Sequence, residues 1–120
     1  MSVYVFTKKE VILKKIFPKD AKYLSLNNTS LSKHSPEEES LSYIDVSGLN
    51  GAELKKILGK LKKICNAVPW GIIDPKGSIK DPVALIIEGA SDYLGPSILK
   101  NPSCINSKRF KKAADWRNTQ

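Results

Sequence analysis

The alternation of two hydrophobic periods constrains this chain more than any single motif does. Short apolar runs rich in β-branched and aromatic residues recur along the sequence, and between them lie segments whose apolar residues return every three or four positions. The first pattern is typical of strands and the second of helices. Strands that alternate with helices lie parallel and are joined by right-handed crossovers. The sequence therefore predicts an α/β fold, an open parallel five-stranded sheet with helices on both faces.

Five segments have the composition of strands, and each is short enough to cross a small sheet once. They are Ser2–Phe6, Lys22–Leu26, Leu41–Val46, Pro69–Asp74 and Ser91–Leu94.

The clearest predicted helix begins at Asn50 and runs to about Cys65. Asn50 is a favourable N-cap, and Glu53 three residues later completes a capping-box-like pair. The apolar residues that follow form one stripe, as a helix packed on a sheet requires. The stripe consists of Leu54, Ile57, Leu58, Leu61 and Ile64.

Three further helices are expected. Glu10–Phe17 is apolar at helical spacing and ends before Pro18, and Asp81 with Pro82 starts a helix to about Glu88 that Gly89 closes. A last helix starts at Asn106 or Ser107, within a C-terminal helix and tail over 105–120. The polar stretch 27–40 predicts an irregular loop with at most a short helix from Pro36, so the second helix of the fold is short or missing.

The length of 120 residues predicts one domain over 1–120. The cysteines Cys65 and Cys104 have no CxxC spacing and His34 is the sole histidine, so we expect no metal site and no cofactor. Two isolated cysteines fit a reducing compartment. No apolar run is long enough to span a membrane, and the N-terminus lacks the charge order of a signal peptide, so we expect a cytoplasmic protein.

The formal net charge of +8 raises the possibility of nucleic-acid binding, because clustered lysines neutralise phosphates and release counterions. The lysines are spread along the chain, however, and most lie beside predicted helix stripes, where a solvated face is the usual role. We therefore expect a protein partner rather than nucleic acid.

The carboxyl ends of the predicted strands carry the residues that suggest a function, because open parallel sheets bind ligands there. Asp45 ends the third strand before a turn with a glycine, and Asp74 ends the fourth. The stretch from Gly89 to Leu94 (GASDYL) resembles the GAxDYL of response-regulator receiver domains, and PWGIID at 69–74 resembles their fourth strand. The spacing from Asp74 to Tyr93 also fits that family. The resemblance covers nearly the whole chain and implies a flavodoxin-like fold with Asp45 at the phospho-accepting position.

The chain departs from the receiver pattern around that position. Receivers place paired acids after strand one to bind magnesium, whereas this chain has Thr7, Lys8 and Lys9. Their hydroxyl residue after strand four aligns with Asp74. The lysine that receivers place before a proline after strand five is missing here, where the chain reads YLGP at 93–96 and is one residue short. Phosphoryl transfer depends on neutralising charge around the transferred group. The resemblance therefore implies a pseudo-receiver with a vestigial pocket of Asp45, Asp74, Thr7, Lys8 and Lys9, which binds no magnesium and is not an enzyme.

Two hypotheses follow for the pocket. Lys8 or Lys9 could lie beside Asp45 and Asp74 as a fixed cation in place of the metal, or both lysines could be solvated. Tyr93 corresponds to the aromatic switch residue of receivers, and the alternative is an ordinary aromatic of the fifth strand.

The predicted fourth helix is almost entirely apolar over 82–87, although a surface helix needs a polar face. Either the rest of the chain covers it or it offers an apolar patch to a partner. In receivers, the fourth helix, fifth strand and fifth helix form the usual dimer or effector surface. We accordingly expect a protein partner or homodimer at a face formed by Val83, Leu85, Ile86, Ile87 and Tyr93.

The preferred function is a phosphorylation-independent regulatory module of a bacterial signalling protein, of the kind found in two-component systems. Three alternatives remain open. Asp45 could still be phosphorylated, or the basic chain could bind nucleic acid. The turn DVSGL at 45–49 also resembles that of STAS (anti-sigma-factor antagonist) domains, in which Ser47 would be the phosphorylated residue.

Overall fold

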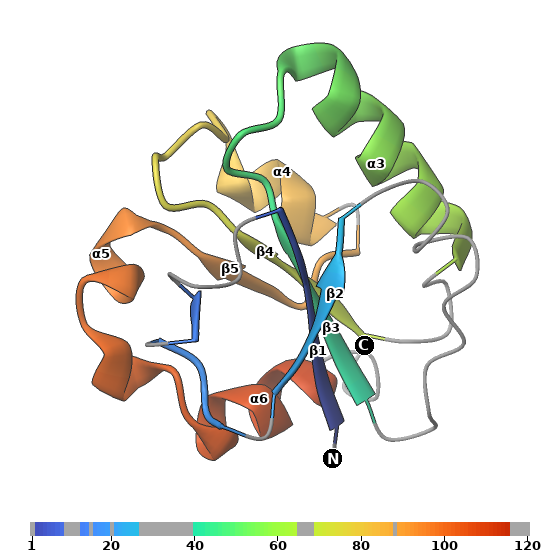
Figure 1. Cartoon of the computed structure of the whole chain (residues 1–120). Coiled ribbons are helices and arrows are strands. Elements are labelled where there is room, and N and C mark those ends of the chain that lie inside the picture. Colours follow the sequence, from blue (N-terminus) through green and yellow to red (C-terminus); the bar gives the residue numbers. More distant parts are fainter. Residues whose placement is uncertain are drawn as a thin grey trace.

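A computed structural model describes residues 2–8, 13–14, 16–19, 21–26, 40–64, 69–87 and 89–115. Its elements follow one another as strands and helices in near alternation (Figure 1). In chain order they are β1 Ser2–Thr7, β2 Lys22–Ser25, β3 Ser40–Asp45, α3 Gly51–Ile64, β4 Trp70–Ile73, α4 Pro82–Ile87, β5 Asp92–Leu94, α5 Pro96–Leu99, the 3₁₀ turn η1 Pro102–Cys104 and α6 Ser107–Ala114.

The five strands form one sheet in the order β2-β1-β3-β4-β5, and every neighbouring pair is parallel. This order is that of flavodoxin-like doubly wound sheets. The predicted α/β class, the five strands and their parallel arrangement are therefore confirmed. No strand end differs from the predicted one by more than one residue, and β3 begins at Ser40, inside the stretch predicted to be loop.

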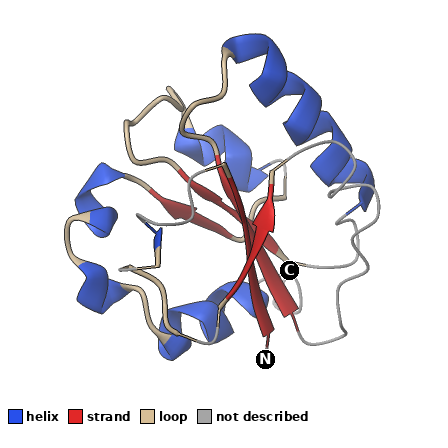
Figure 2. Ribbon diagram, in the orientation of Figure 1, coloured by secondary structure: helices blue, strands red, loops and turns tan. Residues whose placement is uncertain are grey.

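Helices cover both faces of the sheet, as predicted (Figure 2). Because successive strand residues point to opposite faces, the core divides into two clusters. One face packs Val5, Tyr43 and Leu94 against the segment around Phe17 and against α6 through Phe110. The other face packs strand residues against α3 and α4, and its buried members are Phe6, Leu26, Ile44, Val46, Ile57, Trp70, Ile72, Leu85 and Ala90.

Side-chain caps fix the start of three helices. The predicted capping box of α3 is present, since the Glu53 N–H donates to Asn50 Oδ1 at 2.8 Å and the Asn50 N–H donates to Glu53 Oε1 at 3.3 Å. Asp81 accepts from the Ala84 N–H at 3.3 Å before α4. Asn106 accepts from the Arg109 N–H at 3.0 Å before α6, which decides between the two caps predicted there.

Two elements were not predicted from the sequence. The chain after β5 forms α5, whose first residue is Pro96, and then η1, which precedes α6. Both are too short to give a periodic signal. The predicted helix Glu10–Phe17 lies only partly within the described residues, and the stretch 27–39 lies outside them. No helix in the described ranges has the length and hydrophobicity that crossing a membrane requires.

Candidate functional site

Three polar side chains lie at the carboxyl edge of the sheet, where the candidate site is predicted from the sequence. Thr7 ends β1, Asp45 ends β3 and Asp74 directly follows β4, and these three strands are neighbours. All three residues are buried, with Asp74 fully so at 0% exposure. Buried carboxylates are costly unless hydrogen bonds replace their lost water.

Asp45 is held entirely by neutral donors. The Thr7 hydroxyl donates to Asp45 Oδ2 at 2.7 Å. The Ser47 backbone N–H and hydroxyl donate to Asp45 Oδ1 at 3.0 and 2.7 Å. The Ser47 contacts form the local turn that carries the chain out of β3, so the carboxylate caps its own loop. Thr7 and Ser47 thus donate to both carboxylate oxygens of Asp45.

Asp74 has a separate set of donors. The backbone N–H groups of Ser78 and Ile79 each donate to its carboxylate at 2.8 Å, which organises the loop after β4. The Tyr93 hydroxyl donates to Asp74 Oδ2, also at 2.8 Å. The pKa of Tyr93 is raised to about 12, mainly because the phenol is partly buried and secondly because it donates to the Asp74 carboxylate. Tyr93 therefore links β5 to the carboxylate that follows β4 at the carboxyl edge of the sheet.

Among the described residues, Lys8 pairs with Glu53 and with neither aspartate. Its ammonium nitrogen is 3.4 Å from Glu53 Oε2 in the first turn of α3, and both side chains are exposed. Two contacts lower the pKa of Glu53. The larger effect comes from the hydrogen bond that the Asn50 backbone N–H donates, and the smaller from the Lys8 ammonium. Lys9, the other candidate for a fixed cation, lies outside the described residues.

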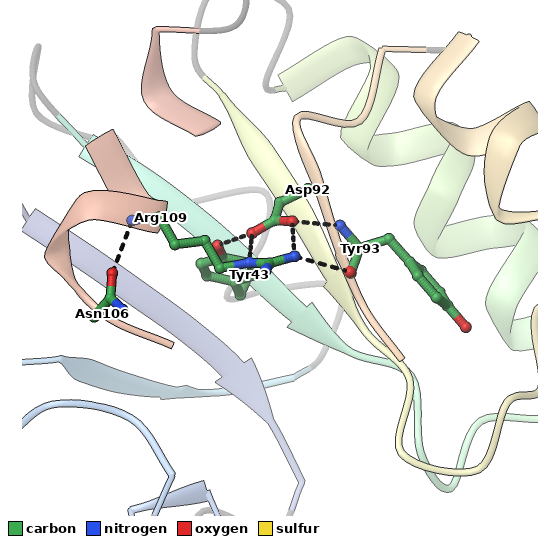
Figure 3. A network of polar contacts seen from close by, with 5 residues as sticks. All are labelled: Tyr43, Asp92, Tyr93, Asn106 and Arg109. Atoms are coloured by element: carbon green, nitrogen blue, oxygen red, sulfur yellow. Dashed lines mark hydrogen bonds and ion pairs between the residues drawn. The ribbon is translucent and has the colours of Figure 1, made fainter. Parts of the chain in front are cut away.

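The structure contains a second polar network that the sequence did not reveal (Figure 3). At its centre is Asp92, the first residue of β5, on the face covered by α6. Arg109 of α6 forms a bidentate pair with it, from Nε to Oδ2 at 2.9 Å and from Nη2 to Oδ1 at 2.8 Å. The Tyr43 hydroxyl donates to Oδ2 at 2.6 Å and the Tyr93 N–H to Oδ1 at 2.9 Å.

Tyr43 reaches Asp92 by lying across the strand between them. Tyr43, Gly71 and Asp92 occupy one row of the sheet on β3, β4 and β5. A Cβ at Gly71 would lie 2.7 Å from Tyr43 Cε1 and 3.1 Å from the Asp92 carbonyl oxygen. The missing side chain of Gly71 therefore makes room for the ring. Burial and the neighbouring Asp92 raise the pKa of Tyr43 far above its ordinary value, so this phenol stays a hydrogen-bond donor.

The network fixes α6 to the sheet. The Tyr43 ring packs edge-on against Phe17 and Phe110, with ring centroids 5.5 and 5.9 Å apart. The hydrogen bonds to Asp92 raise the pKa of Arg109, so the guanidinium is charged throughout the physiological range. One sequence signal could have indicated this network. Asp92 is a carboxylate at the start of a buried strand, and such a residue needs a partner.

The residues predicted to form the interaction face are divided by the structure. Val83 and Ile87 are 65% and 80% exposed, one helical turn apart on α4. Leu85 is buried in the core, and Ile86 and Tyr93 are partly buried against it. Of the five predicted residues, Val83 and Ile87 are therefore the ones with largely exposed side chains.

Metal ligands do not gather at either network. Within the ranges that the structure describes, no group of three or more His, Cys, Asp or Glu side chains is placed to hold an ion. Cys104 is exposed and unpaired, whereas Cys65 and His34 lie outside those ranges. Comparison of the chain with protein-family models, curated proteins and solved structures gave no match in any of the three.

Proposed function

We propose that this chain is a regulatory module with a receiver-like fold that works through protein contacts and not through phosphorylation. One observation carries the proposal. Asp45, at the position where a receiver would be phosphorylated, has its carboxylate oxygens occupied by the Thr7 hydroxyl and by two donors of Ser47.

Two further observations support it. The lysine that follows β1 pairs with Glu53, so it does not neutralise charge next to Asp45. Asp74 stands where a hydroxyl would hold the phosphoryl group, and its oxygens bind the loop after β4 and Tyr93. A carboxylate at this place repels a phosphoryl anion, and phosphoryl transfer requires the opposite arrangement of charge.

The partner surface is the exposed part of the α4 face. Val83 and Ile87 form a small apolar strip on α4. Small apolar patches of this kind support weak, reversible contacts, since stable interfaces bury about 800 Å² on each partner. The module would thus act as an adaptor whose contacts form and dissociate readily.

The phosphorylation state of the chain after treatment with acetyl phosphate and magnesium tests the proposal. We expect the intact mass of the protein to stay unchanged, while a phosphorylatable receiver in the same reaction gains one phosphoryl group. A gain that disappears in Asp45→Asn and persists in Asp81→Asn would refute the proposal and establish the phosphorylatable alternative. Asp81 is a suitable control because it is exposed and lies at a helix cap.

Ser47 tests the STAS-like alternative separately. Its hydroxyl donates to Asp45 at 2.7 Å, so a phosphate on this oxygen would replace that bond and place two anions together. We therefore expect protein purified from its native cells to carry no phosphoserine at this position. Peptide mapping by mass spectrometry decides the point, and a phosphorylated Ser47 would favour the alternative.

A further inference from the structure

A surface hollow lies at the amino end of β5, away from the carboxyl edge that holds Asp45 and Asp74. Its volume of about 280 Å³ is near the lower end for small-molecule sites, so any occupant must be small. The last turn of α4, the start of β5 and one side of α6 form its walls, and the lining residues are Ile86, Ser91, Asp92, Arg109, Lys112 and Ala113.

Unused hydrogen-bond donors gather at this hollow. The Ser91 hydroxyl is buried and has no hydrogen-bond partner, the one such side-chain atom in the part of the chain that the structure describes. Buried polar atoms without partners are rare in folded proteins, so each one calls for an explanation. Lys112 is exposed at the rim and makes no ion pair or hydrogen bond to any described residue.

The acidic group of the hollow is already satisfied. Asp92 accepts from Tyr43, from the Tyr93 N–H and twice from Arg109. Arg109 neutralises its charge, so the ammonium of Lys112 leaves the hollow with a positive charge. Ile86 and Ala113 supply apolar wall on either side.

We propose that this hollow binds a small organic oxyanion, a carboxylate or a phosphate ester with a short apolar body. The oxyanion lies between the Lys112 ammonium and the Ser91 hydroxyl, which turns about its side-chain bond to donate to it. The apolar body contacts Ile86 and Ala113. This site does not depend on the absence of phosphorylation at Asp45.

Amide NMR titrations of the full chain with butyrate, phenyl phosphate and inorganic phosphate test the proposal. We expect saturable shifts at Ser91, Asp92 and Lys112 with butyrate or phenyl phosphate, and weaker binding of inorganic phosphate, which has no apolar body. The better of the first two probes identifies the oxyanion. Lys112→Ala should weaken binding about tenfold, the loss of one charged contact. Lys108→Ala removes the same charge from an exposed residue of the same helix outside the hollow, and should leave the affinity within about twofold.

Ser91→Ala distinguishes binding in the hollow from general attraction of anions to the lysines of α6, because it removes a donor without changing the charge. It removes a buried hydroxyl without a partner, so the chain should be as stable as the parent or more stable, while the affinity for the oxyanion falls. The absence of saturable shifts with all three probes would overturn the proposal. So would equal losses in Lys108→Ala and Lys112→Ala, or an unchanged affinity in Ser91→Ala.

Discussion

Three aspartates are buried among the residues that the structure describes, and they are stabilised in two different ways. Asp45 and Asp74 accept hydrogen bonds from hydroxyl and backbone N–H groups, whereas Asp92 is paired with the guanidinium of Arg109. The backbone N–H groups that donate to the first two belong to the loops after β3 and β4, so these carboxylates organise the local backbone. The charged partner of Asp92 comes from α6, so this carboxylate joins distant parts of the chain.

The bond from Tyr93 to Asp74 should make stability depend on alkaline pH. The pKa of Tyr93 is about 12 in the folded chain and 10.0 unperturbed, so the bond contributes fully below pH 10 and is lost as the pH rises toward 12. Tyr93→Phe should cost about 1–2 kcal/mol at neutral pH, the contribution of one hydrogen bond to a charged group. Urea unfolding of both proteins from neutral pH to pH 12 measures the difference, which should shrink over that interval. A constant difference would contradict this role for the phenol.

At the level of elements, β3, β4, β5 and α6 form one unit through a single row of residues. The row runs from Tyr43 across Gly71 to Asp92, and Arg109 continues it into α6. The centre of the row needs a residue without a side chain, because the Tyr43 ring occupies that space. The stability of α6 therefore depends on Gly71 in β4, a strand that is distant from it in sequence.

Gly71→Ala tests this arrangement directly. The added Cβ would meet the Tyr43 ring at 2.7 Å, so the ring must move and the bond to Asp92 must lengthen. We expect a loss of about 1–3 kcal/mol in the free energy of unfolding, the usual effect of overpacking a core. Gly59→Ala is the matched control, because nothing lies within 4 Å of a Cβ there and α3 should gain up to about 1 kcal/mol. Denaturant unfolding of both variants measures the two signs, and a stable Gly71→Ala protein would refute the account.

The sequence predicted these elements with unequal success, for physical reasons. The strands and α3 have strong periodic patterns, and the cap at Asn50 follows from local hydrogen bonding, so they were predicted nearly to the residue. Tyr43, Asp92 and Arg109 are far apart in sequence and meet only when the sheet forms. No local pattern encodes that meeting. The location of Asp45 and Asp74 at one edge was predictable from strand order, whereas the donors that surround them depend on loop geometry.

At the scale of the whole molecule, a net charge of +8 opposes the approach of a second copy. The apolar strip of Val83 and Ile87 favours that approach, although it is small. The balance between the two sets the sign of the salt effect. Screening weakens repulsion between copies, so self-association through this strip should strengthen as salt is added. Binding to a nucleic acid would weaken instead, because counterions compete with the lysines.

Sedimentation over a range of protein and salt concentrations measures this balance. We expect weak self-association that increases with salt and is lost in a Val83→Ser, Ile87→Ser double variant. The double variant should unfold within about 0.5 kcal/mol of the parent, since both side chains are exposed. Leu85 is a buried neighbour on α4, so Leu85→Ala should lower the free energy of unfolding by about 2–5 kcal/mol. The molecules of this variant that remain folded should still self-associate. A strictly monomeric parent chain at every salt concentration would exclude this use of the strip.

The Tyr43 ring over Gly71 also limits how such a chain can evolve. A side chain at position 71 is compatible with the fold only if residue 43 becomes smaller. That change removes a donor from Asp92 and leaves Arg109 as its sole side-chain partner. Residues at positions 43, 71, 92 and 109 should therefore covary among relatives of this chain. Relatives that keep the glycine should keep the aromatic ring and the ion pair as well.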